Sequence, residues 1–284
     1  WTPLVADGML HGLGACDMKG PLAASLVAAQ AAPADLPLSL LYTFDEETTK
    51  AGARLIAEKS ALMRRFTPKG IVVVEPSAMQ CVRGHRVHVQ FTATAMGVQA
   101  HSSTGKGKNA NLDLIPFLNA LLPIHRRLRE DLAWQDPAYD PPFSDFNIVI
   151  DNHGTAANVT VARATAHIKF RYSRNVDPAP VVAAVREAAE RNGVKLEERH
   201  EGAPPQLPED HPLVAAAVAE TGKPAKTAPY GTDASELQAI APCIVLGPGG
   251  VDTAHTPHER VAVADLAAGP PVLLRLAARV AALT

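Results

Sequence analysis

Two kinds of β-strand pattern occupy different parts of this sequence, and their placement constrains the fold more than any other feature. Nearly continuous apolar runs stand toward both ends, at residues 38–44, 70–74 and 243–246. Such runs are typical of strands that are buried on both faces of a parallel sheet. Residues 87–94 instead alternate apolar and polar side chains, as in an antiparallel strand with one exposed face. The pattern therefore predicts two different sheets.

Helices are predicted between the apolar runs, and together they indicate an α/β layer architecture. These helices cover residues 20–31, 51–62 and 213–221, with a further helix beginning at Pro271. The middle of the chain has the order β-α-β-β-α-β, which is typical of a ferredoxin-like α+β domain. Its remaining elements are strands at 146–150, 164–172 and 194–199 and helices at 112–129 and 177–192. We therefore expect one α/β domain formed by residues 1–81 and 203–284, with an α+β domain of residues 82–202 inserted in it.

Charge and cysteine content exclude several classes of function. The 27 lysines and arginines against 29 acidic residues give a net charge of −2, which provides no basic field for nucleic acid or an anionic membrane. No stretch approaches the ~20 apolar residues of a membrane span, and no signal peptide pattern opens the sequence. The 3 cysteines are far apart and odd in number, which disfavours a disulfide framework. A cytoplasmic location is the expectation.

Several well-known catalytic motifs do not occur in the sequence. Gly12-Leu13-Gly14 begins like a dinucleotide-binding loop, but Asp17 stands where the third glycine belongs. The sequence contains no phosphate-binding loop of the G-K-[ST] type, no H-E-x-x-H pair and no G-x-S-x-G nucleophile elbow. Nucleotide binding, zincin chemistry and serine hydrolase chemistry are therefore not indicated.

Acidic residues and a histidine follow the predicted strands and precede a helix, where open α/β sheets bind their ligands. They are Asp17, the pair Glu46-Glu47, Glu75 and His255. Taken singly, the aspartate could cap a helix, the glutamates could be solvated and the histidine could be structural. Together they place oxygen and nitrogen donors at one sheet edge, a set that suits Zn²⁺, Mn²⁺ or Co²⁺. In an adjacent pair of carboxylates, one can bind a metal ion while the other serves as a general base.

At this point the motifs resemble those of the M20 family of co-catalytic metallopeptidases, most closely its acetylornithine deacetylase and succinyl-diaminopimelate desuccinylase branch. The resemblance runs in order along nearly the whole chain. The segments that carry it are 12–20, Phe44-Asp45-Glu46-Glu47, Val74-Glu75-Pro76-Ser77, 97–103 with Asn109-Ala110, Ala157-Asn158-Val159, Gly231-Thr232-Asp233, and 246–249 with 254–259. It implies a zinc-peptidase-like α/β catalytic domain with an inserted ferredoxin-like lid and dimerisation domain.

The resemblance also implies a metal site. Asp17 would bridge two divalent ions, with Zn²⁺ favoured and Co²⁺ or Mn²⁺ as alternatives. Glu47 and His255 would complete one ion's ligands, and Glu75 would bind the other. Glu46 would be the general base and acid.

Further residues are implied to act on the substrate. His101, in the lid, would reach the active site of a partner subunit in a homodimer and stabilise the oxyanion. Asn158, Arg171, Gly231 and Thr232 would hold the substrate carboxylate. Lys169 stands where the family usually has an acidic residue, and Arg174 is the alternative anchor for the carboxylate.

The implied activity is removal of an acyl group from an N-acyl amino acid. Two alternatives remain: a dipeptidase or aminoacylase of the same family, and a catalytically impaired fragment or degenerate homologue that binds a metal or a partner without turnover. Family members carry a His-x-Asp segment on an earlier strand, upstream of the position of Trp1-Thr2, and this sequence does not supply it. We therefore expect an α/β domain that is short at its N-terminal end, with two protein ligands left for the ion held by Asp17 and Glu75.

Overall fold

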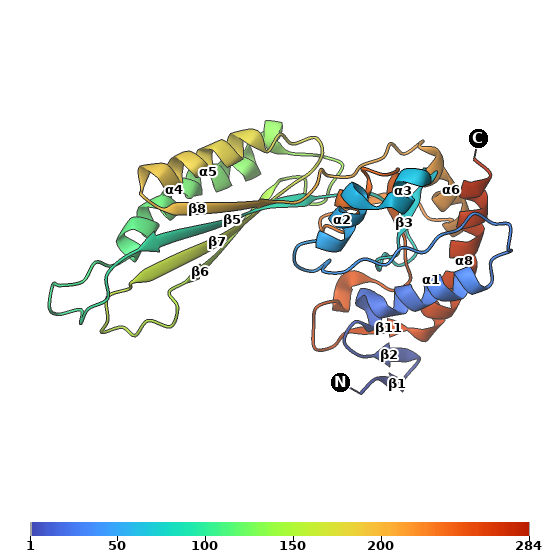
Figure 1. Cartoon of the computed structure of the whole chain (residues 1–284), viewed down its shortest axis with the longest axis horizontal. Helices are drawn as coiled ribbons and strands as arrows, with labels where there is room; N and C mark the ends of the chain where they lie inside the picture. Colours follow the sequence, from blue (N-terminus) through green and yellow to red (C-terminus); the bar gives the residue numbers. More distant parts are fainter. Residues whose placement is uncertain (1, 284) are drawn as a thin grey trace. The chain divides into compact units, whose positions relative to one another are not determined.

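The computed structural model describes residues 2–283, which form two compact units. The first unit contains the described residues up to His85 and from Pro205 onward, and we call it the split unit. The second unit contains Arg86–Pro204, and we call it the inserted unit. Figure 1 shows the elements of each unit along the chain.

The split unit is built on a four-stranded sheet with the strand order β3-β10-β4-β9. Its strands are β3 (Ile71–Val73), β4 (Val82–His85), β9 (Lys226–Ala228) and β10 (Cys243–Val245). β10 pairs with β3 in parallel and with β4 in antiparallel orientation, and β4 pairs with β9 in parallel. A smaller antiparallel sheet has the order β1-β2-β11, formed by β1 (Leu4–Ala6), β2 (Met9–His11) and β11 (Arg260–Ala262).

Helices cover both faces of the four-stranded sheet. The helices α1 (Gly20–Gln30), α6 (Pro212–Thr221) and α8 (Val263–Ala281) pack in one apolar cluster with Ile244. The helices α2 (Ala51–Lys59) and α7 (Ala234–Leu237) pack in another with Val245, and α3 (Ala61–Arg65) follows α2. Successive residues of β10 thus enter opposite clusters, because side chains alternate across a strand. The predicted α/β layer architecture is confirmed.

The inserted unit has the order β5-α4-β6-β7-α5-β8, as its sequence pattern predicts. Its strands are β5 (Val87–Met96), β6 (Asp145–Asp151), β7 (Arg163–Tyr172) and β8 (Lys195–His200), and they form an antiparallel sheet with the order β6-β7-β5-β8. The helices α4 (Asn111–Glu130) and α5 (Ala179–Arg191) lie along the same face of this sheet (Figure 1). A single apolar cluster joins them to the sheet, and Phe91, Phe117 and Phe170 are fully buried in it. This is the ferredoxin-like topology.

The strand predicted at residues 38–44 is wrong. The segment is irregular and its apolar side chains are exposed, from 36% for Leu38 to 62% for Phe44. Among residues 2–283, no strand forms a ladder with it. An apolar run becomes a strand only where a neighbouring strand supplies hydrogen bonds, and the run itself does not reveal whether one is present.

The helix predicted to begin at Pro271 starts earlier, at Val263. Pro270 and Pro271 lie inside α8 instead of in its first turn, the position that proline prefers and on which the prediction depended. Gly269 lies close to Pro248, where an added Cβ would come within 3.2 Å of the proline ring. No helix within residues 2–283 is long and apolar enough to cross a membrane.

Candidate metal centre

Three loops of the split unit carry the candidate metal ligands. Asp17 lies in a short helical turn (Ala15–Lys19) that begins after Gly14, whose φ of 74° suits glycine. Glu47 lies in a turn before α2. His255 follows the short helical turn Val251–Thr253, beyond β10. Each of the three side chains therefore lies in a loop or turn of the split unit, close to a regular element of the fold.

Asp17, Glu47 and His255 converge, and their ligand atoms all lie within 4.8 Å of one another. The Nε2 atom of His255 lies 2.8 Å from Oδ2 of Asp17 and 3.1 Å from Oε1 of Glu47. Partial burial lowers the pKa of His255, but the two carboxylates outweigh it and raise the pKa above its usual value. The cluster is thus a place where positive charge is stabilised. Among residues 2–283, it is the one group of three or more histidine, cysteine or acidic side chains that could hold a metal ion.

Glu75 lies two residues after the end of β3 and is buried beside Asp17. Burial raises the pKa of Glu75 well above its usual range, and the carboxylates of Asp17 and Glu46 raise it further. A carboxyl group in such surroundings either keeps a proton or has a cation beside it. Glu75 therefore lies next to the cluster of Asp17, Glu47 and His255 without being one of its three members.

Glu46 lies in the same turn as Glu47, and Asp45 shapes this turn. The hydroxyl groups of Thr48 and Thr49 donate to the Asp45 carboxylate, and the N–H of Lys50 donates to the carbonyl oxygen of Asp45 at 2.8 Å. Burial raises the pKa of Glu46 to about 7. The Lys50 ammonium lowers this pKa, whereas the carboxylates of Asp233, Glu47 and Asp17 raise it. A carboxyl group that titrates near neutral pH is suited to general acid and base chemistry.

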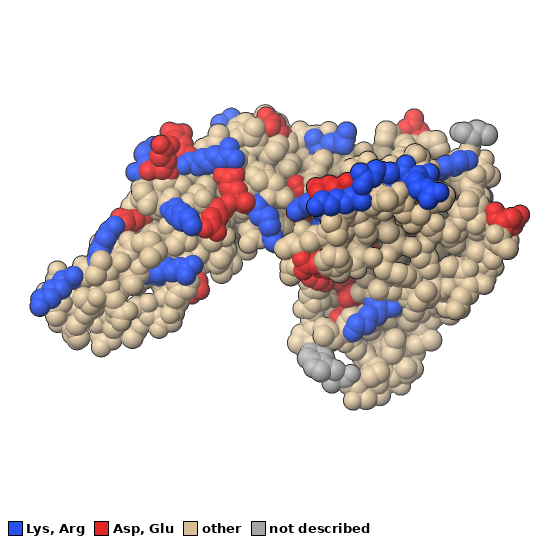
Figure 2. Space-filling view, in the orientation of Figure 1, with Lys and Arg blue, Asp and Glu red and all other residues tan. Residues whose placement is uncertain are grey.

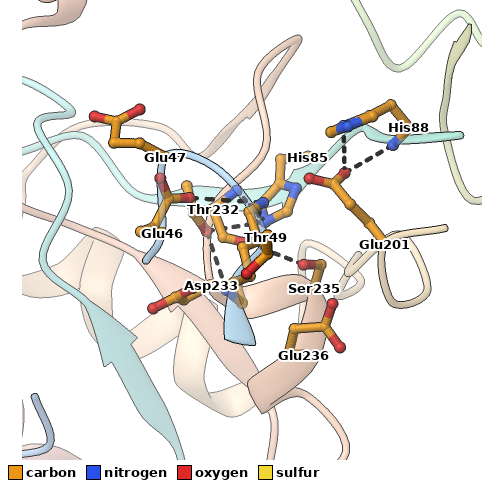
Figure 3. Close-up of polar contacts among 12 residues, drawn as sticks. Glu46, Glu47, Thr49, His85, His88, Glu201, Thr232, Asp233, Ser235 and Glu236 are labelled. Carbon is orange, nitrogen blue, oxygen red and sulfur yellow. Dashed lines mark hydrogen bonds and ion pairs between the residues drawn. The ribbon is translucent and has the colours of Figure 1, made fainter. Parts of the chain in front are cut away.

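A buried polar network lies beneath Glu46. Thr232 receives a hydrogen bond from Lys50 Nζ at its carbonyl oxygen (3.0 Å), and its hydroxyl lies 3.0 Å from Nε2 of His85. Ser235 donates to the same carbonyl oxygen at 3.1 Å (Figure 3). Asp233 accepts a hydrogen bond from the hydroxyl of Thr43 at 2.5 Å. The predicted substrate residue Thr232 thus has its hydroxyl engaged with His85 in the interior, next to Gly231.

A second buried carboxylate, that of Glu259, holds the loop that carries Asp17. Its Oε1 accepts hydrogen bonds from the N–H groups of Cys16 (3.0 Å) and Asp17 (2.9 Å), and its Oε2 accepts one from Gly14 (2.7 Å). Charge-assisted hydrogen bonds of this kind are stronger than neutral ones. Glu259 therefore fixes the backbone from which the Asp17 side chain projects.

The inserted unit carries the other predicted site residues. His101 and Asn158 stand in neighbouring loops: residue 101 forms a β-bridge with Val159, and the Ser102 N–H donates to the carbonyl oxygen of Asn158 at 2.9 Å. Both residues are exposed, and the Oγ of Ser103 lies 2.8 Å from Nδ1 of His101. Arg171 lies farther along the chain in β7, opposite His88 of β5, and is half-buried. The structure thus brings His101 and Asn158 together.

The donor set of the split unit fits a divalent metal ion. Two carboxylates and one imidazole supply three ligands, which is the number that a catalytic zinc ion has in proteins. In the space-filling view, acidic side chains gather on one face of the split unit (Figure 2). Among residues 2–283, Glu75 is a further buried carboxyl group next to Asp17.

Comparisons with known proteins support this chemistry. The model of peptidase family M20/M25/M40 matches residues 1–279. The chain belongs to this family. It is 32% identical over 269 residues to an acetylornithine deacetylase of Proteus mirabilis, a match that covers 91% of this chain and 68% of that protein. An acetylornithine deacetylase of Yersinia pseudotuberculosis is 32% identical over 270 residues, with the same coverage of both chains.

Solved structures of a metallo-carboxypeptidase and a dipeptidase share the fold. An M20 family metallo-carboxypeptidase from Sulfolobus solfataricus superposes with a TM-score of 0.75 at 16% identity, covering 99% of this chain and 79% of that chain. Human carnosine dipeptidase 1 gives a TM-score of 0.71 at 16% identity, covering 99% and 76%. The predicted family and fold class are confirmed, and the chain is an M20 hydrolase of a metal-dependent family that acts on amide bonds.

Sequence reasoning assigned no role to Lys50 and Glu259, which contact the candidate site residues Glu46 and Asp17. Lys50 belongs to no motif, and its burial beside Glu46 follows from a left-handed backbone conformation (φ 54°) at the start of α2. Glu259 ends the motif that contains His255, and its distance of 242 residues from Asp17 gives no indication of their contact. The one signal in the sequence that points to Glu259 is that this acidic residue stands four positions after the candidate ligand His255.

Proposed function

We propose that the chain is a metal-dependent hydrolase that removes an acyl group from an N-acyl amino acid, of the acetylornithine deacetylase type. The observation that carries the proposal is the convergence of Asp17, Glu47 and His255 beside Glu46, whose pKa burial raises to about 7. The curated relatives at 32% identity are named acetylornithine deacetylases, which favours this substrate class over dipeptides.

The metal ions would be held by the converged side chains. Asp17, Glu47 and His255 would bind one ion, and Asp17 and Glu75 would bind a second; Zn²⁺ is favoured, with Co²⁺ or Mn²⁺ as alternatives. Ions bound there would supply Lewis acidity for the amide carbonyl and would lower the pKa of a water molecule. A cation beside Glu75 would also stabilise its carboxylate form, which burial and the neighbouring Asp17 carboxylate otherwise disfavour.

Glu46 carries the proton transfers in this proposal. Its carboxylate accepts a proton from the attacking water molecule and then donates that proton to the leaving amine nitrogen. Burial raises the pKa of Glu46 to about 7 in the metal-free chain, and a nearby cation would lower this pKa and favour the carboxylate form that acts as the base. The Lys50 ammonium lowers the pKa of Glu46 and so favours the carboxylate form, which is the form that can accept a proton.

The inserted unit would act as the lid and dimerisation domain. His101 would donate a hydrogen bond to the developing oxyanion in the site of a partner subunit. Asn158, Arg171 and the turn at Gly231-Thr232 would bind the substrate carboxylate, with Arg171 suited to a bidentate contact. The exposed position of His101 beside Asn158 supports a role in contacts outside their own loops.

The substitution Glu46→Gln tests the proposal because glutamine keeps the size of the side chain and cannot accept the proton. We expect kcat for acetylornithine to fall by about 100-fold or more while metal content is retained. Glu58→Gln, on the exposed side of α2, is the matched control and should leave kcat unchanged. Unchanged turnover by Glu46→Gln would refute the general-base role, and cleavage of dipeptides but not acetylornithine would favour the dipeptidase alternative.

A further inference from the structure

The side chain of Glu259 joins two ligand-bearing loops of the split unit through three hydrogen bonds. It follows His255 by four residues and directly precedes β11, and 4% of its surface is exposed. Both of its carboxylate oxygens are used, because Oε1 accepts from Cys16 and Asp17 and Oε2 accepts from Gly14. A carboxylate so deeply buried is costly to desolvate unless such donors surround it.

Backbone and thiol contacts join the same two loops at further points. The N–H of Gly12 donates to the carbonyl oxygen of Glu259 at 3.1 Å. The buried thiol of Cys16 donates to the carbonyl oxygen of Gly250 at 2.8 Å. The loop that carries His255 is therefore attached to the loop that carries Asp17 along its length, with Glu259 as the attachment nearest to Asp17 itself.

We propose that Glu259 is a positioning residue of the metal centre, which sets the separation and direction of Asp17 relative to His255. The inference depends on the proposed function, since it assumes that Asp17 and His255 bind a metal ion. Its basis is that one of the three donors is the N–H of Asp17 itself, so the carboxylate holds the atom next to the Cα from which the ligand side chain extends. Groups that orient metal ligands in this way contribute strongly to metal affinity.

The substitution Glu259→Gln removes one part of this arrangement. The three N–H groups require three acceptor positions, and the amide group of glutamine offers acceptors on one side only. Its NH₂ group must then face either the Gly14 N–H or the two N–H groups of Cys16 and Asp17. At least one hydrogen bond is lost, and the negative charge behind the loop is lost with it.

The test is a Co²⁺ titration of the metal-free chain, followed by the visible absorption of the bound ion and by competition with a chelator. We expect Glu259→Gln to weaken Co²⁺ affinity by about 10- to 100-fold and to change the absorption spectrum. Glu220→Gln is the matched control, because Glu220 is a half-buried glutamate in the same unit that pairs with Arg275 and Arg279 on α8. It should lose stability and keep the wild-type affinity and spectrum.

The outcomes separate this proposal from the proposed function. Wild-type affinity and spectrum in Glu259→Gln would overturn the positioning role, even if the variant unfolds at lower temperature. Absence of Co²⁺ binding by the wild-type chain would overturn both the metal site and this inference. Should Glu259→Gln fail to fold, Glu259→Asp decides: it keeps the charge but is one methylene shorter, so unchanged affinity contradicts the role and weakened affinity supports it.

Discussion

The Nζ atom of Lys50 lies 3.6 Å from Oε1 of Glu46, inside the split unit. Two opposing effects therefore act on one carboxyl group: burial raises the pKa of Glu46, and the adjacent ammonium lowers it. The net value of about 7 is the result of both, since burial is the larger effect. Lys50 also donates to the carbonyl oxygen of Thr232, so its own position is fixed.

Replacing this cation should move the pH at which Glu46 titrates. Lys50→Met keeps most of the side-chain volume and removes the charge, so the acidic limb of kcat/KM should shift upward by about 1 pH unit or more. Lys59→Met, at the exposed end of α2, is the control and should leave the limb in place. An unchanged pH profile in Lys50→Met would show that the ammonium does not influence the base.

The sequence predicted the inserted unit more completely than the split unit, for a physical reason. Its strands alternate apolar and polar residues because one face of the sheet is covered by α4 and α5. The pattern therefore predicts each strand and also which of its side chains face the core. In the split unit the runs at 38–44 and 70–74 both predict a buried strand, yet only the second becomes one, β3. The difference depends on pairing with β10, which is far away in sequence.

The candidate site also contains residues that the sequence could predict and residues that it could not. Asp17, Glu47 and His255 could be predicted because each belongs to a motif and follows or precedes a regular element. Lys50, His85 and Glu259 could not, because their roles are contacts with backbone or side chains of other segments. Such contacts depend on loop conformations that no periodicity describes.

Stability of the metal-free chain should fall as pH rises from about 5 to about 8. The pKa of Glu46 is raised from 4.5 to about 7, and the pKa values of Glu75, Asp233 and His255 are also raised. Burial lowers the pKa of His88, which acts in the opposite direction but is one group against four. The folded state therefore holds protons that the unfolded state has released, and the free energy of unfolding decreases as these groups titrate. Chemical denaturation at several pH values measures this dependence.

Glu46→Gln should flatten that pH dependence, because it removes one of the titrating groups. We expect the variant to be more stable than the wild type at pH 8 by on the order of 2 kcal/mol and to differ little at pH 5. Glu58→Gln should follow the wild-type curve. A metal-free wild type whose stability is constant or rises over this range would contradict the burial of these carboxyl groups.

Metal removal should destabilise the chain through the cluster that contains His255. A ligand that binds only the folded state stabilises it by about 4 kcal/mol at 1,000 times its Kd, so Zn²⁺ should raise Tm and a chelator should reverse the effect. His255→Ala should abolish most of the Zn²⁺-dependent rise, because it removes the nitrogen that contacts both carboxylates. Differential scanning fluorimetry with and without Zn²⁺ provides the measurement.

His258→Ala is the matched control for that experiment. His258 is an exposed residue three positions farther along the same loop, and its backbone N–H donates to the hydroxyl of Thr256 at 3.2 Å. Its Zn²⁺-dependent rise in Tm should equal that of the wild type. Equal responses in His255→Ala and the wild type would place the metal elsewhere.

A mixing experiment should reveal whether His101 acts across a dimer. His101→Ala and Glu46→Gln should each be nearly inactive alone, since one lacks the oxyanion donor and the other lacks the base. In a hybrid dimer, the His101→Ala subunit keeps Glu46 and receives the intact His101 of its partner, so one of the two sites is complete. Equal mixing with free exchange should then restore about a quarter of wild-type activity.

His167 is an exposed histidine on β7, and His167→Ala is the control that should be active alone. Light scattering should show dimers for all variants and for the mixture. If the mixture stays inactive although hybrid dimers form, His101 does not serve the partner's site.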